Sequence, residues 1–594
     1  MNVKSTVIFT ACVAASLAGI CETMYSYDPA DSQIYVATVP DGETNEISSA
    51  AAAVLNGGGV TNFVKLGAGT LISNKDITSY TGGIRIEDGI FRSVPNVKAN
   101  DTVGKLSGGG EIWVLDGATM ELYAPSIYLT HMTDKTTHIA GRGFGDRGAL
   151  VLCAGSINQT AATFGSTVKL EADALVSNES TAQFHIAVDG CTLDFNSHTL
   201  YLGGTGEVGF YDKPTLSNMP NPGTAIMSEG YGVKFQRNRT GTWNLWHTYC
   251  DIVLEKSSRL IFDSYFGSTF AWPIKMRDGS GIHVKANAGS WASNTSYNTI
   301  TQNGVVHLLD PDRNWLQFNN ANDFLQVKGK LTGGGLLVKT YTPGSALYLG
   351  NSGNDFTNGI VATACSVHLL ANGALPAAGA ALSLTNGHAV FHSSQAYSLP
   401  PLTAHGNCSI TNHTGFSPTG AWRDSVTKTG SGTLRYDTLV GAPLLDVRGG
   451  TVKINGADGA LPEFGAFGGV SAGTIDLGGE SYSVGELQGS PAISNCPTLT
   501  VTSGVTVDAA SDGAGGVTTD GVLSFANGAS VSVLNRSAIG SGRRQRSWLL
   551  ATAAGGIVGM PDCSALTGWS LVKSADGKTL TLFGPAVGFK MVFR

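Results

Sequence analysis

Apolar and polar residues alternate in short stretches along most of this chain, and glycine-rich turns separate the stretches. Residues 84–87 (Ile-Arg-Ile-Glu) alternate apolar and charged side chains, with Thr-Gly-Gly before them and Asp-Gly after them. A period of two predicts a strand with one buried and one exposed face, and the glycine pairs predict turns. The pattern therefore predicts an all-β protein made of many short strands.

The same order of turn and strand recurs in three places. Residues 65–72 are Lys-Leu-Gly-Ala-Gly-Thr-Leu-Ile, and residues 426–434 are Val-Thr-Lys-Thr-Gly-Ser-Gly-Thr-Leu. The most complete copy spans residues 331–376 and ends in Gly-Ala-Leu-Pro. Glycine permits the positive φ of a tight corner, and the following Thr-Leu pair favours an extended strand. Recurrence of this unit predicts stacked repeats.

This order of motifs resembles the autotransporter-associated β-strand repeat: G-x-G-T-L, a Tyr/Phe-Thr-Gly/Asn-Gly turn, a strand, and a G-A-L-P ending. The resemblance covers residues 60–95 and 325–460 best, with looser echoes elsewhere. It implies a right-handed parallel β-helix, or β-solenoid, whose inward Val, Ile and Leu side chains form one continuous core. Members of this family are bacterial surface or secreted proteins, many of them adhesins.

The two ends of the chain predict caps on this stack. The Ala-rich residues 47–55 predict a short helix over the first rung, with a disordered leader as the alternative. Residues 480–594 contain short strand-like stretches that predict further rungs and a C-terminal β-cap. A typical autotransporter ends in a translocator barrel of ~10-residue alternating strands, and we expect none here.

Composition and repeats divide the chain into six predicted regions. They are a signal peptide (1–18), an N-terminal leader and cap (19–56), β-helix repeats (57–230), a Trp-rich irregular segment (231–325), further β-helix repeats (326–480), and C-terminal β rungs with a cap (481–594). A chain of 594 residues exceeds the size at which one compact core keeps growing, and a stack of rungs meets that limit.

The N-terminus predicts export. Lys4 precedes an apolar run over residues 7–18, and Ser16 and Ala18 form an A-x-A-like cleavage pattern. The run is too short to span a bilayer as a helix, and no comparable stretch follows. Cys21 suggests a lipid anchor, but Ile20 stands where such a signal has a small residue. We expect a secreted or cell-surface protein without a transmembrane helix after signal removal.

Composition indicates a folded chain that is rich in turns and poor in charge. The 79 glycines are about twice the usual ~7 % share, and charged residues make up 14 % of the chain against an ordinary ~25 %. The 42 % of hydrophobic residues argues against disorder. The net charge is −7, and the only basic cluster is residues 543–546, either a solvated loop or a patch for proteases or anionic surfaces. Nucleic-acid binding is not expected.

Cysteine spacing predicts neither a metal site nor a dense disulfide framework. Beyond the signal, cysteines stand at positions 153, 191, 250, 365, 408, 496 and 563, without a C-x-x-C pair. We expect most of them to be small buried hydrophobes, with a few sequence-distant disulfides as the alternative. Asn-Gly and Asp-Gly pairs are isolated turns. No metal or other cofactor is predicted.

A tryptophan-rich interval is the best candidate for a binding surface. Five of the nine tryptophans lie there: Trp243, Trp246, Trp272, Trp291 and Trp315. Aromatic faces stack on sugar rings, so a row of them on the flank of a solenoid would contact a glycan; core packing would place tryptophan there equally well. Exposure of the side chains decides between the two.

Catalytic candidates are few. Asp310, Asp312 and Arg313 form one group, and Asp278 near His283 forms another. Both Asp-Pro-Asp and Asp-Gly-Ser-Gly are also good turn sequences. The chain has no G-x-S-x-G elbow, no H-E-x-x-H and no P-loop, so no catalytic residue is assigned.

The sequence thus predicts a secreted or cell-surface structural or adhesive β-solenoid without an evident catalytic site. Its expected partners are glycans, extracellular matrix or other cell-surface proteins. The alternative is a carbohydrate-active enzyme, a polysaccharide lyase or glycoside hydrolase, or a glycan-binding protein on the same scaffold.

Overall fold

The computed structural model describes residues 23–585 apart from short gaps. The gaps are residues 76, 78, 95–109, 124–127, 132–135, 154–160, 165–166, 188–189, 212–213, 238–243, 246–249, 265–267, 286–298, 312–313, 321–322, 341–343, 377–380, 414–417, 423–424, 456–459, 471, 510–515 and 537–546. The chain divides into two compact units, Met1–Leu309 (unit 1) and Asp310–Arg594 (unit 2).

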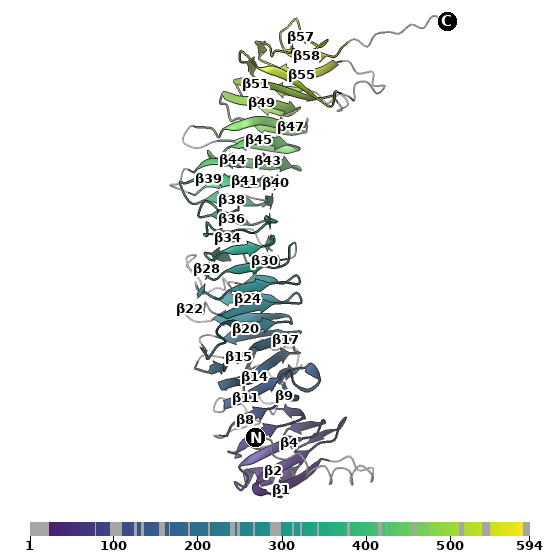
Figure 1. The fold of residues 1–594 in the computed structure, drawn as a ribbon, viewed down its shortest axis with the longest axis vertical. Coiled ribbons are helices and arrows are strands. Elements are labelled where there is room, and N and C mark those ends of the chain that lie inside the picture. Colours follow the sequence, from purple (N-terminus) through teal and green to yellow (C-terminus); the bar gives the residue numbers. More distant parts are fainter. Residues whose placement is uncertain are drawn as a thin grey trace, which may run out of the picture. The chain divides into compact units, whose positions relative to one another are not determined.

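Strands of unit 1 form one large sheet, a second sheet and a small third sheet (Figure 1). The large sheet contains β1 (Met24–Asp28), β2 (Asp31–Thr38), β3 (Thr44–Glu46), β4 (Asn62–Leu66), β5 (Thr70–Ser73), β6 (Gly83–Ile86), β7 (Gly89–Ser93), β8 (Ile112–Val114), β9 (Ala118–Tyr123), β11 (Thr136–Gly141), β12 (Leu150–Cys153), β14 (Thr167–Asn178), β16 (Thr192–Asp194), β17 (Leu200–Gly204), β19 (Thr215–Ser217), β20 (Gly223–Ser228), β23 (Cys250–Leu254), β26 (Ile274–Met276) and β29 (Val306–Leu308). The second contains β10 (Tyr128–His131), β13 (Ala161–Phe164), β15 (Gln183–Ala187), β18 (Glu207–Tyr211), β21 (Gly232–Arg237), β24 (Arg259–Ser264) and β27 (Gly281–Val284). The third contains β22 (Asn244–Leu245), β25 (Ser268–Phe270) and β28 (Thr299–Gln302).

Strands of unit 2 form two long sheets, called sheet B and sheet C below. Sheet B contains β30 (Asn314–Phe318), β33 (Leu336–Thr340), β35 (Ile360–Thr363), β37 (Leu382–Thr385), β40 (Leu402–His405), β43 (Ser425–Thr429), β45 (Ala442–Val447), β47 (Phe464–Gly469), β49 (Tyr482–Gly489), β51 (Thr498–Asp508), β53 (Val522–Phe525), β54 (Ser530–Leu534) and β56 (Ile557–Val558). Sheet C contains β31 (Phe324–Val327), β34 (Ala346–Leu349), β36 (Ser366–Leu369), β38 (His388–Phe391), β41 (Cys408–Asn412), β44 (Thr433–Asp437), β46 (Gly450–Ile454), β48 (Gly473–Asp476), β50 (Ala492–Ser494), β52 (Val517–Thr519), β55 (Ser547–Ala553), β58 (Thr579–Phe583) and β57 (Ser570–Lys573). Strand β32 (Leu331–Gly333) precedes β33, and β39 (Ala396–Leu399) pairs with β42 (Thr419–Trp422).

Parallel pairing between successive rungs confirms the predicted β-solenoid. Strands such as β36 and β38 alternate buried and more exposed positions, and pairing in register stacks like positions on top of one another. One inward column of unit 2 consists of Leu347, Val367, Ala389 and Ile410. All four side chains are completely buried. A continuous apolar core follows, and neighbouring rungs stabilise one another.

The predicted repeat turns are held together by buried lysines. The ammonium of Lys65 donates hydrogen bonds to the carbonyl oxygens of Gly67, Gly69 and, in the next rung, Asp88. Lys428 occupies the same place in the second copy, where it donates to Gly430 at 2.9 Å. Neither lysine is exposed. The lysine that precedes G-x-G-T-L therefore satisfies turn carbonyls that would otherwise be buried without partners.

The ends of the stack carry the predicted caps. Helix α2 (Ser49–Asn56) forms where the Ala-rich segment predicts it, with Ser48 as its N-cap, while β1 covers the first rung by pairing antiparallel to β2. A short 3-10 helix, η1 (Phe144–Asp146), lies within unit 1. At the other end, β58 pairs antiparallel with both β55 and β57. These antiparallel strands pair with outermost parallel strands that would otherwise offer a template for edge-to-edge association.

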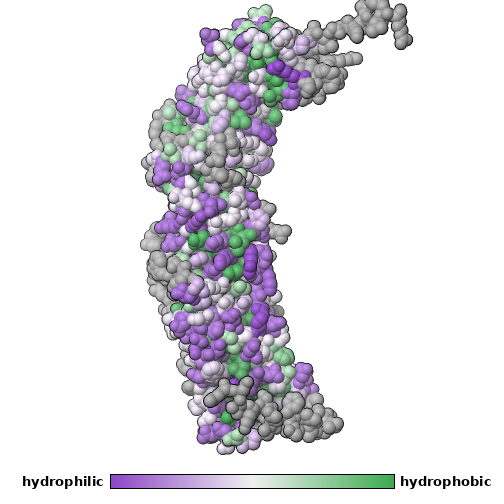
Figure 2. All heavy atoms as spheres, in the orientation of Figure 1, coloured by the Kyte–Doolittle hydropathy of each residue, from purple (hydrophilic) through white to green (hydrophobic). Residues whose placement is uncertain are grey.

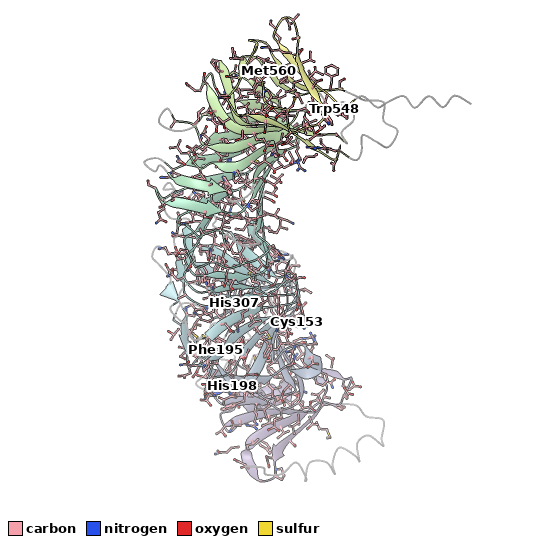
Figure 3. The ribbon with its side chains drawn as sticks, turned by 45° about the horizontal axis from the view of Figure 1, so that its top comes forward. Cys153, Phe195, His198, His307, Trp548 and Met560 are labelled. Atoms are coloured by element: carbon pink, nitrogen blue, oxygen red, sulfur yellow. The ribbon has the colours of Figure 1, made fainter. Side chains whose placement is uncertain are left out.

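Side-chain placement follows the alternation along the strands. Phe195 and Trp548, which Figure 3 labels, are 0 % and 5 % exposed and belong to the core. On the face that Figure 2 shows, hydrophilic residues cover much of the described surface and hydrophobic ones lie among them in small areas. Within the described part of the chain, no helix combines the length and the hydropathy that crossing a bilayer requires.

Candidate functional site

The outer face of sheet C in unit 2 gathers the most varied set of chemically useful side chains. Strands β34, β36, β38 and β41 pair in parallel register, so that side chains pointing outward from successive rungs stand above one another. Neighbouring strands lie about 4.8 Å apart. Residues one rung apart in sequence are therefore direct neighbours on this surface.

Four aromatic rings form a stack at the N-terminal end of this face. Tyr348 lies 4.2 Å, between ring centroids, from His368, with which it is paired in register. His392 follows at 4.8 Å from His368, and His413 at 4.2 Å from His392. Tyr348, His368 and His392 are partly exposed and His413 is exposed. We call these four residues the aromatic column.

Hydrogen bonds fix the imidazoles of this region. The Nδ1 of His368 lies 2.6 Å from the Nε2 of His392, so one nitrogen donates and the other accepts. The Nδ1 of His388 lies 2.7 Å from the hydroxyl of Ser409 in the adjacent strand. This arrangement requires at least one imidazole of the His368–His392 pair to be neutral.

Burial and mutual repulsion hold these imidazoles in the neutral form. Burial, together with the neighbouring His392, His413 and His388, lowers the pKa of His368 to about 3. Burial likewise lowers the pKa of His392 to about 4, again with a contribution from His413, and it lowers the pKa of His388. The rings of Tyr348, His368 and His392 are therefore uncharged at neutral pH.

Charged side chains continue the same face beyond the aromatic column. Ser409 is in register with Arg435 of β44, and Arg435 with Lys453 of β46. Arg435 forms a salt bridge of 3.3 Å with Asp437 of its own strand. Both Arg435 and Lys453 are exposed.

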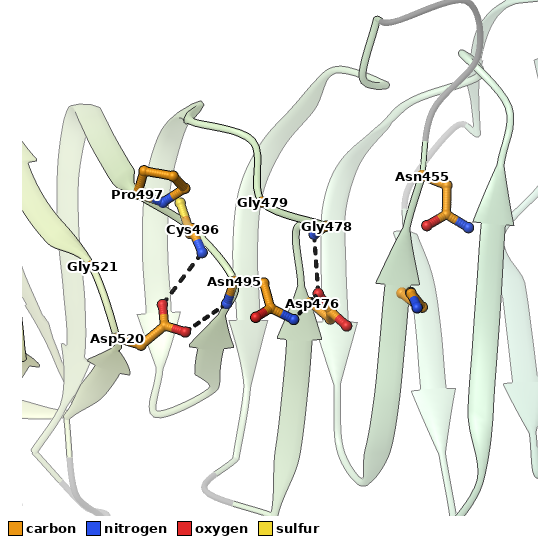
Figure 4. Close-up of a pocket in the computed structure, with 10 residues that line it drawn as sticks. Asn455, Asp476, Gly478, Gly479, Asn495, Cys496, Pro497, Asp520 and Gly521 are labelled. Atoms are coloured by element: carbon orange, nitrogen blue, oxygen red, sulfur yellow. Dashed lines mark hydrogen bonds between the residues drawn. The ribbon is translucent and has the colours of Figure 1, made fainter.

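An open groove of about 620 Å³ lies at the end of this charged stretch. Its polar lining comes from four rungs: Lys453, Asn455, Asp476, Asn495 and Asp520 (Figure 4). The side chain of Asn495 donates to Asp476 at 2.8 Å, and its backbone N–H donates to Asp520 at 2.7 Å. The groove is thus a row of amides and carboxylates held in place by turn hydrogen bonds.

The aromatic column, the charged stretch and the groove together form what we call the sheet C stripe. Aromatic faces offer stacking surfaces, and fixed amides, carboxylates and one ammonium offer hydrogen bonds to hydroxyl groups. The groove is open rather than enclosed, which suits an extended ligand better than a small buried one. Among the described residues, no group of three or more His, Cys, Asp or Glu side chains could hold a metal ion.

The structure describes two of the five candidate tryptophans, Trp272 and Trp315. Trp272 is 1 % exposed and packs edge-on against Phe235, with 6.4 Å between ring centroids. It belongs to the core of unit 1 and cannot stack on a glycan. Trp315 lies on β30 of unit 2 and is partly exposed. Trp243, Trp246 and Trp291 lie outside the described residues, so their role stays a prediction.

The structure describes three of the predicted catalytic candidates, Asp278, His283 and Asp310. Asp278 lies in a turn with φ of 56°, and its carbonyl accepts a hydrogen bond from the N–H of Ser257. His283 on β27 is only 4 % exposed. The carbonyl of Asp310 accepts from the side-chain amide of Asn314, whereas Asp312 and Arg313 lie outside the described residues. The turn interpretation fits Asp278, and the enzyme alternative stays a prediction.

A buried charge cluster in unit 1 is a different kind of feature. The Nζ of Lys234 lies 2.7 Å from Asp263 and 3.3 Å from Glu207, on three adjacent strands. Burial raises the pKa of Glu207, but Lys234 and Lys285 outweigh burial and lower it overall. Lys234 is 1 % exposed. These buried charges neutralise one another, and a substrate cannot reach Lys234.

The described cysteines behave as small hydrophobic residues. All seven are free thiols, and Cys153, labelled in Figure 3, lies at the end of β12. Burial raises the pKa of Cys250 to about 11 and that of Cys365 to about 12. The predicted burial is confirmed for most of them, and the disulfide alternative is wrong for these seven in this structure.

Sequence reasoning missed the sheet C stripe. Its members are single Tyr, His, Asn and Asp residues in different repeats, and no local motif joins them. The available signal was the recurrence of a polar ring at one strand position, as in Leu-Tyr-Leu at residues 347–349 and Val-His-Leu at residues 367–369.

In comparisons with known proteins, the chain matches no family model and no curated protein.

Proposed function

We propose that this protein is a secreted or cell-surface structural β-solenoid that adheres to glycans through the sheet C stripe. One observation carries the proposal: parallel register places stacking rings, charged groups and a polar groove in sequence along one face of a single sheet. A linear polysaccharide presents the complementary sequence of ring faces and hydroxyl groups. The repeat resemblance and the N-terminal export signal support the surface location.

The rigidity of the scaffold supports binding by preorganisation. The rings of Tyr348 and His368 are fixed by strand pairing, and the groove side chains of Asp476 and Asn495 by hydrogen bonds. Ordering such groups in the free protein lowers the entropic cost of binding. Many weak contacts along one polymer then add through multivalency.

Affinity electrophoresis and calorimetry with neutral polysaccharides such as xylan and glucomannan test the proposal. We expect Tyr348→Ala and Lys453→Ala each to weaken binding several-fold, because one removes a stacking face and the other a groove donor. Thr403→Ala is the matched control, since Thr403 lies on the outer face of sheet B in register with Thr427. Equal loss in the control and the stripe variants, or no binding of any polysaccharide, would overturn the proposal.

A further inference from the structure

Four imidazoles gather on the outer face of sheet C, on or directly after three strands that carry no carboxylate of their own. Strands β36, β38 and β41 contribute His368 and His388, and the residues that follow β38 and β41 are His392 and His413. None of these three strands contains Asp or Glu. A surface able to acquire several positive charges thus has no anion of its own in these strands.

Among the described residues of the neighbouring strands β34 and β44, the one carboxylate is already engaged. Strand β34 contributes Tyr348 and no charge. On the far side, Arg435 of β44 is exposed, and Asp437 is engaged by it and by the side-chain amide of Asn455 at 2.6 Å. The groups that act electrostatically on His368 are His388, His392 and His413. Each of them is an imidazole, which can carry only a positive charge.

The contact between His368 and His392 makes protonation of this cluster dependent on a counter-ion. At 2.6 Å the two rings share one proton between two nitrogens. A second charge in so close a pair is opposed by Coulomb repulsion. An anion placed against the cluster removes that opposition, so anion binding and proton uptake favour each other.

We infer that His368, His388 and His392, with His413 stacked on His392, form a proton-linked anion site that takes the carboxylate or sulfate groups of an acidic glycan. The inference rests on the proposed glycan function and specifies its ligand class. It makes His368 and His392 a neutral stacking surface above pH 7 and a cationic one in mildly acidic surroundings once the polymer is present. Uronate and sulfate groups are the glycan substituents that carry fixed negative charge at such pH values.

Binding of polygalacturonate to the full chain at pH 7.5 and pH 5.0 tests the inference. We expect affinity to rise at least tenfold on acidification, and calorimetry in buffers of different ionisation enthalpy to show proton uptake. A neutral glucan should show no such change. In His392→Gln, affinity for polygalacturonate should differ less than twofold between the two pH values. The matched control is His405→Gln, an exposed imidazole on sheet B that contacts Thr429 at 3.2 Å.

A second arm separates failure of this site from failure of the proposed function. Inorganic sulfate at pH 5.0 should raise the melting temperature of the wild-type protein and of His405→Gln, and leave that of His392→Gln unchanged. Sulfate stabilisation without binding of any polysaccharide would keep the anion site and overturn the glycan function. Neutral-polymer binding with equal pH dependence in both histidine variants would keep the glycan function and overturn the anion site.

Discussion

The ammonium nitrogen of Lys65 lies 2.8 Å from the carbonyl oxygen of Asp88, one rung further along the solenoid. The same ammonium donates to the carbonyl of Gly69 at 2.6 Å, within its own turn. One buried cation thus joins two successive corners of the stack. The carbonyl of Gly69 also accepts the backbone N–H of Ile90. A side-chain donor with several N–H groups supplies the further hydrogen bonds that the corner carbonyls need.

Replacing this lysine should destabilise unit 1. In Lys65→Met the stem is kept, but the carbonyls of Gly67 and Asp88 lose their side-chain donor and that of Gly69 keeps only the N–H of Ile90, at a cost of about 2–4 kcal/mol. Urea unfolding followed by circular dichroism measures the shift. Lys75→Met is the control, because Lys75 is partly exposed and its pair with Glu46 spans 3.5 Å at the surface. We expect less than about 0.5 kcal/mol there, and an equal effect of the two changes would refute the role of Lys65.

Corner glycines should resist substitution where another backbone approaches them. Gly450 has φ of 70°, and a Cβ atom there would collide with the carbonyl oxygen of Gly432 and lie 3.0 Å from Nζ of Lys428. Gly117 has φ of 83° and nothing within 4 Å. Gly117→Ala should cost only the left-handed strain of about 1–2 kcal/mol, and Gly450→Ala clearly more. Equal melting temperatures of the two variants would contradict this account of close packing.

Acidification should weaken unit 2 through the imidazoles. The folded pKa of His368 is about 3 and that of His392 about 4, because burial disfavours imidazolium. An unfolded imidazole titrates near ~6.5. As pH falls from 6.5 towards 4, the unfolded chain binds protons that the folded chain does not, so the free energy of unfolding falls. The urea midpoint should drop less over this pH range in His368→Gln than in wild type. An identical dependence of the midpoint on pH in the two proteins would count against this role of His368.

Thiol chemistry should distinguish buried from accessible cysteines. Burial raises the pKa of Cys250 to about 11 and that of Cys365 to about 12, and both side chains are buried. A native-state alkylation followed by mass spectrometry should leave them unmodified, whereas Cys191 and Cys563 are partly exposed and should react first. Modification of Cys365 as fast as that of Cys563 in folded protein would show that the core is not closed there.

Much of the fold follows from local sequence rules. Alternation at residues 84–87 predicts a strand, and β6 forms over Gly83–Ile86 with Ile84 and Ile86 inside. The Ala-rich segment predicts a helix, and α2 forms there because Ser48 caps it and Leu55 anchors it. These outcomes depend on neighbours in sequence and on the two-residue period of strands.

The candidate site does not follow from such rules. Tyr348, His368 and His392 become neighbours only through the register of three rungs, which depends on the length of every intervening turn. Trp272, a candidate for the binding surface, is buried, since its volume and apolar area favour the core over the surface. Exposure is a tertiary property, and neither residue type nor spacing along the chain determines it.

Hydrogen–deuterium exchange of the full chain, with and without a saturating polysaccharide, tests the glycan surface most directly. We predict slower exchange at the turns and strands of sheet C from β34 to β52, with the segments around Tyr348 and Asn495 affected together. Sheet B strands β37, β40 and β43 should exchange as in the free protein. Protection confined to sheet B, or identical exchange with and without a polymer that demonstrably binds, would contradict the assignment of binding to the sheet C stripe.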